Sequence, residues 1–244
     1  MCIAVCAWRC DPDYPLVVIA NRDEFHDRPT APLSRWNDGS GITAGRDLKS
    51  GGTWIGVSEQ AGRLALITNF RDPTNFRADA PSRGALVTDW LTGDWHRVED
   101  RWSSLADYNG FSLILIDGPH GWIVDNRTMA EPRAMDLGGY YGLSNAAFTD
   151  PWPKVDRLID DMRGVLDFGP PNEDAFFAML GKGGPRAEAD SENAPVFIRD
   201  PLYGTRCSTV VAIGKDGTGT IAERRFNAEG FETGMTRIDL TYRG

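Results

Sequence analysis

The stretch that decides the fold opens the chain as Met1-Cys2-Ile3-Ala4-Val5-Cys6-Ala7-Trp8 and returns as Pro15-Leu16-Val17-Val18-Ile19-Ala20-Asn21. Two apolar runs separated by turn-prone residues at 10–13 predict a β-hairpin with strands over residues 2–9 and 15–21. The second run leads directly into Arg22-Asp23-Glu24. Because a hairpin folds back on itself, we expect this polar cluster to lie level with Cys2.

Further strands are predicted outward from the hairpin at Thr53–Ser58, Arg63–Asn69, Phe111–Asp117, Gly121–Asp125, Thr205–Ile213, Thr220–Phe226 and Met235–Tyr242. Short turns between many of them favour antiparallel pairing, since a parallel pair needs a long crossover. Helices are predicted from a Ser82 cap to about Leu91, over residues 150–166, and after an Asn172 cap. Gly181–Pro195 is expected to be a loop. This order predicts an α+β fold of sheets covered by helices, in a single domain over residues 1–244.

Charge and hydropathy limit the partners that we expect. The chain has 26 basic and 35 acidic residues, a net charge of −9 that argues against nucleic acid as a partner. No stretch approaches the ~18 apolar residues of a membrane span, and the first residues lack the features of a signal peptide. We therefore expect a cytoplasmic protein without membrane insertion, whose four cysteines are reduced thiols.

Cys2 is the first candidate for chemistry. Removal of Met1 would leave a thiol and an α-amine on one residue, and an amine with a pKa of about 8 can act as a base at neutral pH. Such a residue can attack an amide or ester carbonyl without a catalytic histidine. The alternative is that Cys2 simply begins a half-buried strand whose inward face continues through Ala4, Cys6 and Trp8.

Five other residues are candidates for the same site. Arg22 would favour a thiolate by its charge, and Asp23 could accept protons from the amine; the alternative for this cluster is a solvated turn. Asn69 and Asn145 could donate to an oxyanion, or could be ordinary turn asparagines. Arg206 would supply a second cation, or could be a plain surface arginine.

No metal site is expected. Cys2, Cys6 and Cys10 are spaced by four residues, and over eight strand residues they span roughly 26 Å, too far to share one ion. Haem would need an axial ligand, for which His26, Cys2 or a tyrosine could serve.

Several sequence blocks occur in a characteristic order along nearly the whole chain. They are Met1-Cys2-Ile3, Ala20-Asn21-Arg22-Asp23-Glu24-Phe25 with Arg28-Pro29, Gly51-Gly52-Thr53-Trp54-Ile55-Gly56, Ala65-Leu66-Ile67-Thr68-Asn69, Tyr108-Asn109-Gly110-Phe111, Tyr141-Gly142-Leu143-Ser144-Asn145 with Pro151-Trp152, and Tyr203-Gly204-Thr205-Arg206. Together they resemble the NRDE family, also called the transport and Golgi organisation protein 2 family. That family is similar in turn to N-terminal-nucleophile hydrolases of the penicillin V acylase, bile salt hydrolase and acyltransferase type.

The resemblance implies a four-layer αββα sandwich of antiparallel sheets. It implies Cys2 as nucleophile and base, with Arg22 and Asp23 beside it, Asn69 and Asn145 as oxyanion amides, and Arg206 as a late arginine. Those hydrolases read Arg-Asn-x-Asp where this chain reads Asn-Arg-Asp-Glu, so the order differs here.

Two functions follow from the resemblance. The first is an amidohydrolase or acyltransferase that uses Cys2 on a small-molecule substrate and requires no cofactor. The alternative is a non-catalytic carrier or chaperone for a hydrophobic ligand such as haem or a lipid, since eukaryotic members of the family are associated with Golgi organisation, lipid metabolism and haem trafficking.

Overall fold

The N-terminal hairpin forms as predicted in the computed structural model, which describes residues 2–150, 152–185 and 195–243. Strand β1 (Ile3–Trp8) pairs antiparallel with β2 (Leu16–Phe25). The turn between them is fixed by Asp11, whose carboxylate accepts the backbone N–H of Asp13 at 2.7 Å and that of Tyr14 at 3.0 Å. The local turn chemistry of the sequence therefore sets the hairpin.

Strand β2 is longer than predicted. It continues past Asn21 to Phe25, because β13 (Tyr203–Ile213) pairs with it antiparallel along its whole length. The polar residues 21–24 therefore lie inside a strand with a long-range partner and not in a turn after it. Ile3 lies opposite Asn21, so Cys2 comes level with Arg22, as the hairpin predicts.

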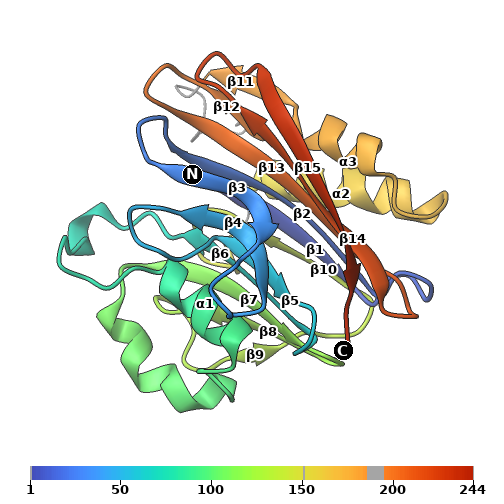
Figure 1. Cartoon of the computed structure of the whole chain (residues 1–244). Helices are drawn as coiled ribbons and strands as arrows, with labels where there is room; N and C mark the ends of the chain where they lie inside the picture. The colour runs from blue at the N-terminus through green and yellow to red at the C-terminus, as the bar shows by residue number, and fades with distance from the viewer. Residues whose placement is uncertain (1, 151, 186–194, 244) are drawn as a thin grey trace. The chain divides into compact units, whose positions relative to one another are not determined.

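These strands belong to the first of two compact units, which comprises the residues up to Arg28, Asp136–Leu143 and Thr149–Leu240. Its main sheet has the order β10-β1-β2-β13-β14-β15 (Figure 1). The added strands are β10 (Gly139–Leu143), β14 (Thr218–Phe226) and β15 (Glu232–Thr241, with its last residue in the second unit). A short parallel pair, β11 (Gly183–Pro185) and β12 (Phe197–Arg199), lies in the same unit.

Helices α2 (Pro153–Asp167) and α3 (Glu173–Leu180) pack against one face of this sheet. Their apolar stripes join Ile3, Val5 and Ala7 of β1 in one core cluster. Ala4, Cys6 and Trp8, which point to the other face, are buried as well. The unbroken apolar run of β1 is thus explained by burial on both faces.

The second unit comprises Pro29–Met135, Ser144–Phe148 and the residues from Thr241 onward. Its sheet has the order β3-β4-β5-β6-β7-β8-β9, and each strand pairs antiparallel with its neighbours. The strands are β3 (Thr30–Arg35), β4 (Ile42–Asp47), β5 (Ile55–Ser58), β6 (Arg63–Asn69), β7 (Phe111–Asp117), β8 (His120–Asp125) and β9 (Arg133–Ala134). Helix α1 (Gly84–Thr92) packs on this sheet. Along the chain it is preceded by the 3-10 helix η1 (Pro73–Asn75) and followed by the 3-10 helix η2 (Val98–Asp107).

The predicted α+β class with antiparallel sheets and covering helices is confirmed, and every predicted strand is present. Asn172 caps α3 as predicted, by accepting the N–H of Ala175 at 3.0 Å, and Gly93 ends α1 in the left-handed region. The predicted Ser82 cap is wrong: Arg83 holds the cap position, and its side chain accepts no hydrogen bond from the first turn of the helix. The start of α1 is fixed instead by close backbone approach, since a Cβ on Gly52 would lie 2.5 Å from the carbonyl carbon of Gly84.

The expected loop over Gly181–Pro195 contains β11 at its start, while residues 186–194 lie outside the described residues. The single domain over residues 1–244 stays a prediction. None of the helices in the described part of the chain is long and apolar enough to cross a membrane.

Candidate functional site

Cys2 lies at the start of the hairpin with a partly exposed side chain. Its Sγ is 3.9 Å from the main-chain oxygen of Asp23, to which the thiol donates. Loss of solvation raises the pKa of this thiol, and the negative charge of Asp23 adds to the effect, whereas the positive charge of Arg22 lowers it. In this setting the thiol holds its proton at neutral pH, so an attack on a carbonyl needs a base.

The Asp23 carboxylate is buried and fixed by partners on β13. Its Oδ1 accepts the Thr205 hydroxyl at 2.6 Å, and that hydroxyl in turn accepts the N–H of Ile198 at 2.9 Å. The Tyr203 hydroxyl donates to the Asp23 main-chain oxygen at 2.8 Å. Burial raises the pKa of Asp23, and the Thr205 bond and nearby positive charges oppose that rise. A carboxylate so placed can accept protons from an amine on Cys2.

Arg22 is buried beside the thiol, and its positive charge is balanced by Glu24. Its Nη2 lies 3.9 Å from Glu24 Oε2, and Arg28 Nε lies 3.6 Å from the same oxygen. Glu24, for which the sequence predicted no role, therefore contacts both arginines and is the counter-ion of Arg22.

Arg206 occupies a β-bulge in β13, where the register shifts between Thr205 and Cys207. Its Nη1 donates to the main-chain oxygens of Phe25, at 2.8 Å, and Arg28, at 3.3 Å. Partial burial lowers the pKa of Arg206, and the like charge of Arg22 adds to the effect. The bulge thus places Arg206 against the end of β2. Cys2, Arg22, Asp23 and Arg206 all lie in the first unit, and a contact between Arg206 and Cys2 stays a prediction.

Asn69 and Asn145 lie in the second unit and contact each other. Asn145 is buried, and its Nδ2 donates to the main-chain oxygen of Asn69 at 2.5 Å. Its Oδ1 has no hydrogen-bond partner among the described residues. The structure therefore brings these two predicted oxyanion residues together, and their convergence on Cys2 stays a prediction.

Lys154 is a site residue that the sequence reasoning missed. It lies in the first turn of α2 and is only 1% exposed, and its Nζ is 5.2 Å from the ring centroid of Trp152. Its positive charge lowers the pKa of Asp23. One signal was available: a cation in the first turn of a helix opposes the helix dipole and needs another reason to be there.

Cys207 was also not predicted. It lies opposite Arg22 on β13, so the arginine is flanked by Cys2 on one neighbouring strand and Cys207 on the other. Burial raises the pKa of Cys207 well above its usual range, and the negative charge of Glu223 raises it further. This thiol is therefore the less reactive of the two.

The described ranges contain no group of three or more His, Cys, Asp or Glu side chains that could hold a metal ion. The cluster around Cys2 is built instead from two thiols, two carboxylates and several cations. Such a set can bind an acyl group or an amine, position it and stabilise the charge that develops on it. These are the steps that reactions of amide and ester carbonyls require.

These features define an α+β protein with two main antiparallel sheets, whose N-terminal hairpin carries a cluster of cysteine, arginine and aspartate. The chain belongs to the Transport and Golgi organisation 2 family, whose family model matches residues 1–228. The resemblance proposed from the sequence blocks is thereby confirmed.

Relatives with the family's name include the human Transport and Golgi organization protein 2 homolog, 34% identical over 245 residues that cover 86% of each chain. The bovine homolog is 33% identical over 250 residues, again with 86% of each chain covered. Among solved structures, the Caenorhabditis elegans ortholog of N-acylethanolamine-hydrolyzing acid amidase has a TM-score of 0.43 and 10% identity, over 85% of this chain and 91% of its own.

Proposed function

We propose that this protein is an N-terminal-nucleophile hydrolase or acyltransferase, in which Cys2 becomes the first residue after removal of Met1 and attacks the carbonyl carbon of an amide bond. The observation that carries the proposal is the contact between Cys2 and Asp23, whose main-chain oxygen lies 3.9 Å from Sγ and whose carboxylate is buried. The substrate is a small-molecule amide, the site of action is the cytoplasm, and no cofactor takes part.

The Cys2 amine supplies the base that the protonated thiol needs. The thiol proton passes to the amine while Sγ adds to the carbonyl carbon. Collapse of the tetrahedral intermediate then breaks the C–N bond, and the ammonium returns the proton to the departing amine. Water attacks the thioester left on Sγ, which gives a carboxylic acid and the free thiol; an amine that attacks in place of water completes an acyl transfer.

The neighbouring residues have separate roles in this proposal. Asp23 holds the ammonium, Lys154 supports the charge of Asp23, and Arg22 stabilises negative charge on sulfur. Arg206 holds the end of β2 through two main-chain oxygens. Asn69 and Asn145 are the proposed donors to the oxyanion.

The test compares three variants on a panel of N-acyl amides and acyl thioesters. Cys2→Ala removes the nucleophile, and we expect turnover to fall by at least about 10³-fold. Cys2→Ser replaces the thiol by a weaker hydroxyl nucleophile and should retain a small fraction of the wild-type activity. Cys10→Ala is the matched control, because Cys10 is also a partly exposed thiol, and it should keep full activity. Turnover that survives in Cys2→Ala would contradict the proposal.

A second proposal is a carrier for haem or a lipid on an inactive scaffold. The observation that favours it is the desolvation of Cys2, which raises the thiol pKa and disfavours the reactive thiolate. A carrier is indifferent to the removal of Met1, whereas the enzyme requires it. Titration with haemin tests haem as the ligand: a saturable Soret shift supports the carrier, and an absent or non-saturable shift removes haem.

A further inference from the structure

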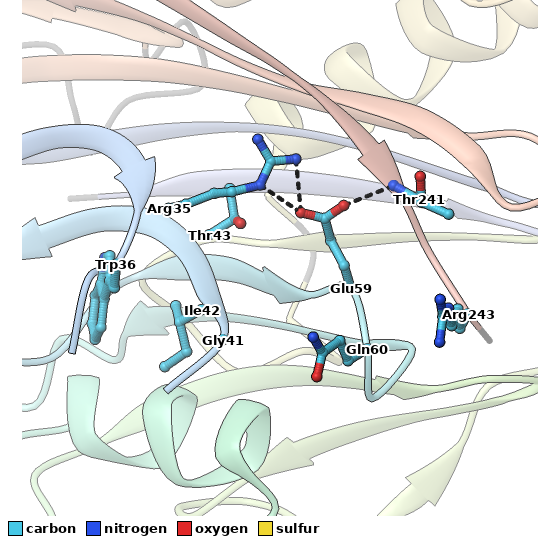
Figure 2. Close-up of a pocket in the computed structure, with 9 residues that line it drawn as sticks. All are labelled: Arg35, Trp36, Gly41, Ile42, Thr43, Glu59, Gln60, Thr241 and Arg243. Atoms are coloured by element: carbon cyan, nitrogen blue, oxygen red, sulfur yellow. Dashed lines mark hydrogen bonds and ion pairs between the residues drawn. The ribbon is translucent and has the colours of Figure 1, made fainter. Parts of the chain in front are cut away.

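A pocket of about 340 Å³ lies within the second unit. Its walls come from the end of β3, the start of β4, the turn between β5 and β6, and the last residues of the described chain (Figure 2). The residues that matter for its chemistry are Arg35, Trp36, Ile42, Glu59, Gln60 and Arg243. None of them belongs to the cluster around Cys2.

The carboxylate of Glu59 is fully engaged at the centre of this pocket. Its Oε1 accepts Arg35 Nε and Nη2, both at 2.9 Å, and its Oε2 accepts the N–H of Thr241 at 2.7 Å (Figure 2). Glu59 therefore cancels the charge of Arg35 and ties the end of the chain to the β5–β6 turn.

Arg243 supplies the one positive charge in the pocket wall that Glu59 does not neutralise. Its backbone N–H donates to the main-chain oxygen of Glu59 at 3.0 Å, which fixes the residue at the pocket wall. Among the described residues, none forms a hydrogen bond or ion pair with its guanidinium. Among the lining side chains only Arg35, Glu59 and Arg243 are charged, so the wall carries one net positive charge in a chain whose net charge is −9.

The apolar side of the pocket is held in place before any ligand arrives. Trp36 donates its Nε1–H to the main-chain oxygen of Ala44 at 3.1 Å, and the Arg46 guanidinium lies 4.1 Å from its ring centroid. Ile42 is buried beside it. Trp36 packs against the core cluster that contains Ile42, so the fixed aromatic ring offers a ready surface to the body of a ligand.

We propose that this pocket binds a small organic carboxylate, with its carboxylate on Arg243 and its apolar body against the ring of Trp36. The volume is within the range of small-molecule sites, and Gln60 supplies an additional donor and acceptor at the rim. The proposal is independent of the proposed reaction of Cys2.

The test follows the indole N–H resonance of Trp36 in the full-length protein, assigned by its loss in Trp36→Phe. Phenylacetate is the probe, and phenylacetamide is its neutral counterpart of nearly the same shape. We expect a saturable shift with phenylacetate and about tenfold weaker binding of the amide, because a charge-assisted hydrogen bond is lost. Arg243→Gln should weaken phenylacetate binding about tenfold as well. The exposed cation Lys49, which does not line the pocket, gives the control Lys49→Gln with unchanged affinity.

Three results would overturn the proposal. Equal binding of phenylacetamide and phenylacetate would show that the charge is not used. Inorganic phosphate that binds as tightly as phenylacetate would show that the apolar wall is not used. A shift that fails to saturate with phenylacetate would show that the pocket is not a site.

Discussion

Burial raises the pKa of the Cys2 thiol, whereas the positive charge of Arg22 lowers it. Arg22→Gln removes a positive charge that favours the thiolate, so the pKa of Cys2 should rise further. We expect the alkylation of Cys2 by iodoacetamide, followed on the N-terminal peptide by mass spectrometry, to show its pH midpoint above that of the unfolded protein in wild type and higher still in Arg22→Gln.

Lys215→Gln is the matched control for that experiment, because Lys215 is an exposed cation paired with Asp13 at 2.6 Å. Its Cys2 midpoint should equal that of the wild type. An Arg22→Gln midpoint at or below the wild-type value would contradict the electrostatic role given to Arg22.

Lys154 should stabilise the fold in a pH-dependent way. The folded pKa of Asp23 is raised by burial and held down in part by Lys154. Because the pKa of Asp23 is higher in the folded protein than in the unfolded protein, where it is about 4, protonated Asp23 stabilises the fold at pH values below about 4. This stabilisation is lost as the pH rises through the folded pKa. Lys154→Gln raises the Asp23 pKa further, so this variant should lose more unfolding free energy at pH 7 than at pH 4.

Chemical denaturation at the two pH values measures this difference. Lys182→Gln removes a lysine of an exposed ion pair with Asp161, and should cost little at either pH. If Lys154→Gln destabilises the fold equally at pH 4 and pH 7, then Lys154 stabilises it through packing alone, and the proposed charge interaction with Asp23 is contradicted.

At the scale of elements, Gly142 sets how closely β10 approaches α2. A Cβ at this position would lie 2.0 Å from Val155 Cγ1. Gly142→Ala should therefore lower the unfolding free energy by about 1–3 kcal/mol through overpacking. Val155→Ala makes room, so the double variant should be more stable than the sum of the two single changes predicts. Strict additivity in this double-mutant cycle would contradict the close approach.

The elements that the sequence predicted are those with a strong local pattern. The hairpin, the long apolar strands and the amphipathic α2 depend on runs of neighbouring residues. The missed strands have weak local signals: β3 contains Pro32, and β10 contains Gly139 and Gly142. Their place in a sheet comes from long-range pairing, for β10 with β1, and no local pattern reports it.

The whole molecule decides how much of the site was predictable. The hairpin register alone indicated that Arg22 and Asp23 lie beside Cys2. The contacts of Asp23 with Thr205 and Tyr203 span about 180 residues, and Lys154 reaches the same region from a helix in the middle of the chain. Only folding brings these segments together, so the contacts of Asp23 with them could not be predicted from the spacing of residues along the sequence.

The central claim is that Cys2 is an N-terminal nucleophile, and the mass of the N-terminal peptide tests it most directly. Protein expressed without an N-terminal tag is mixed with an acyl thioester, quenched in acid within the first turnover, and digested. The proposed function predicts a peptide that begins at Cys2 and carries the acyl mass on its thiol. A peptide that still begins at Met1 and carries no acyl group would contradict it.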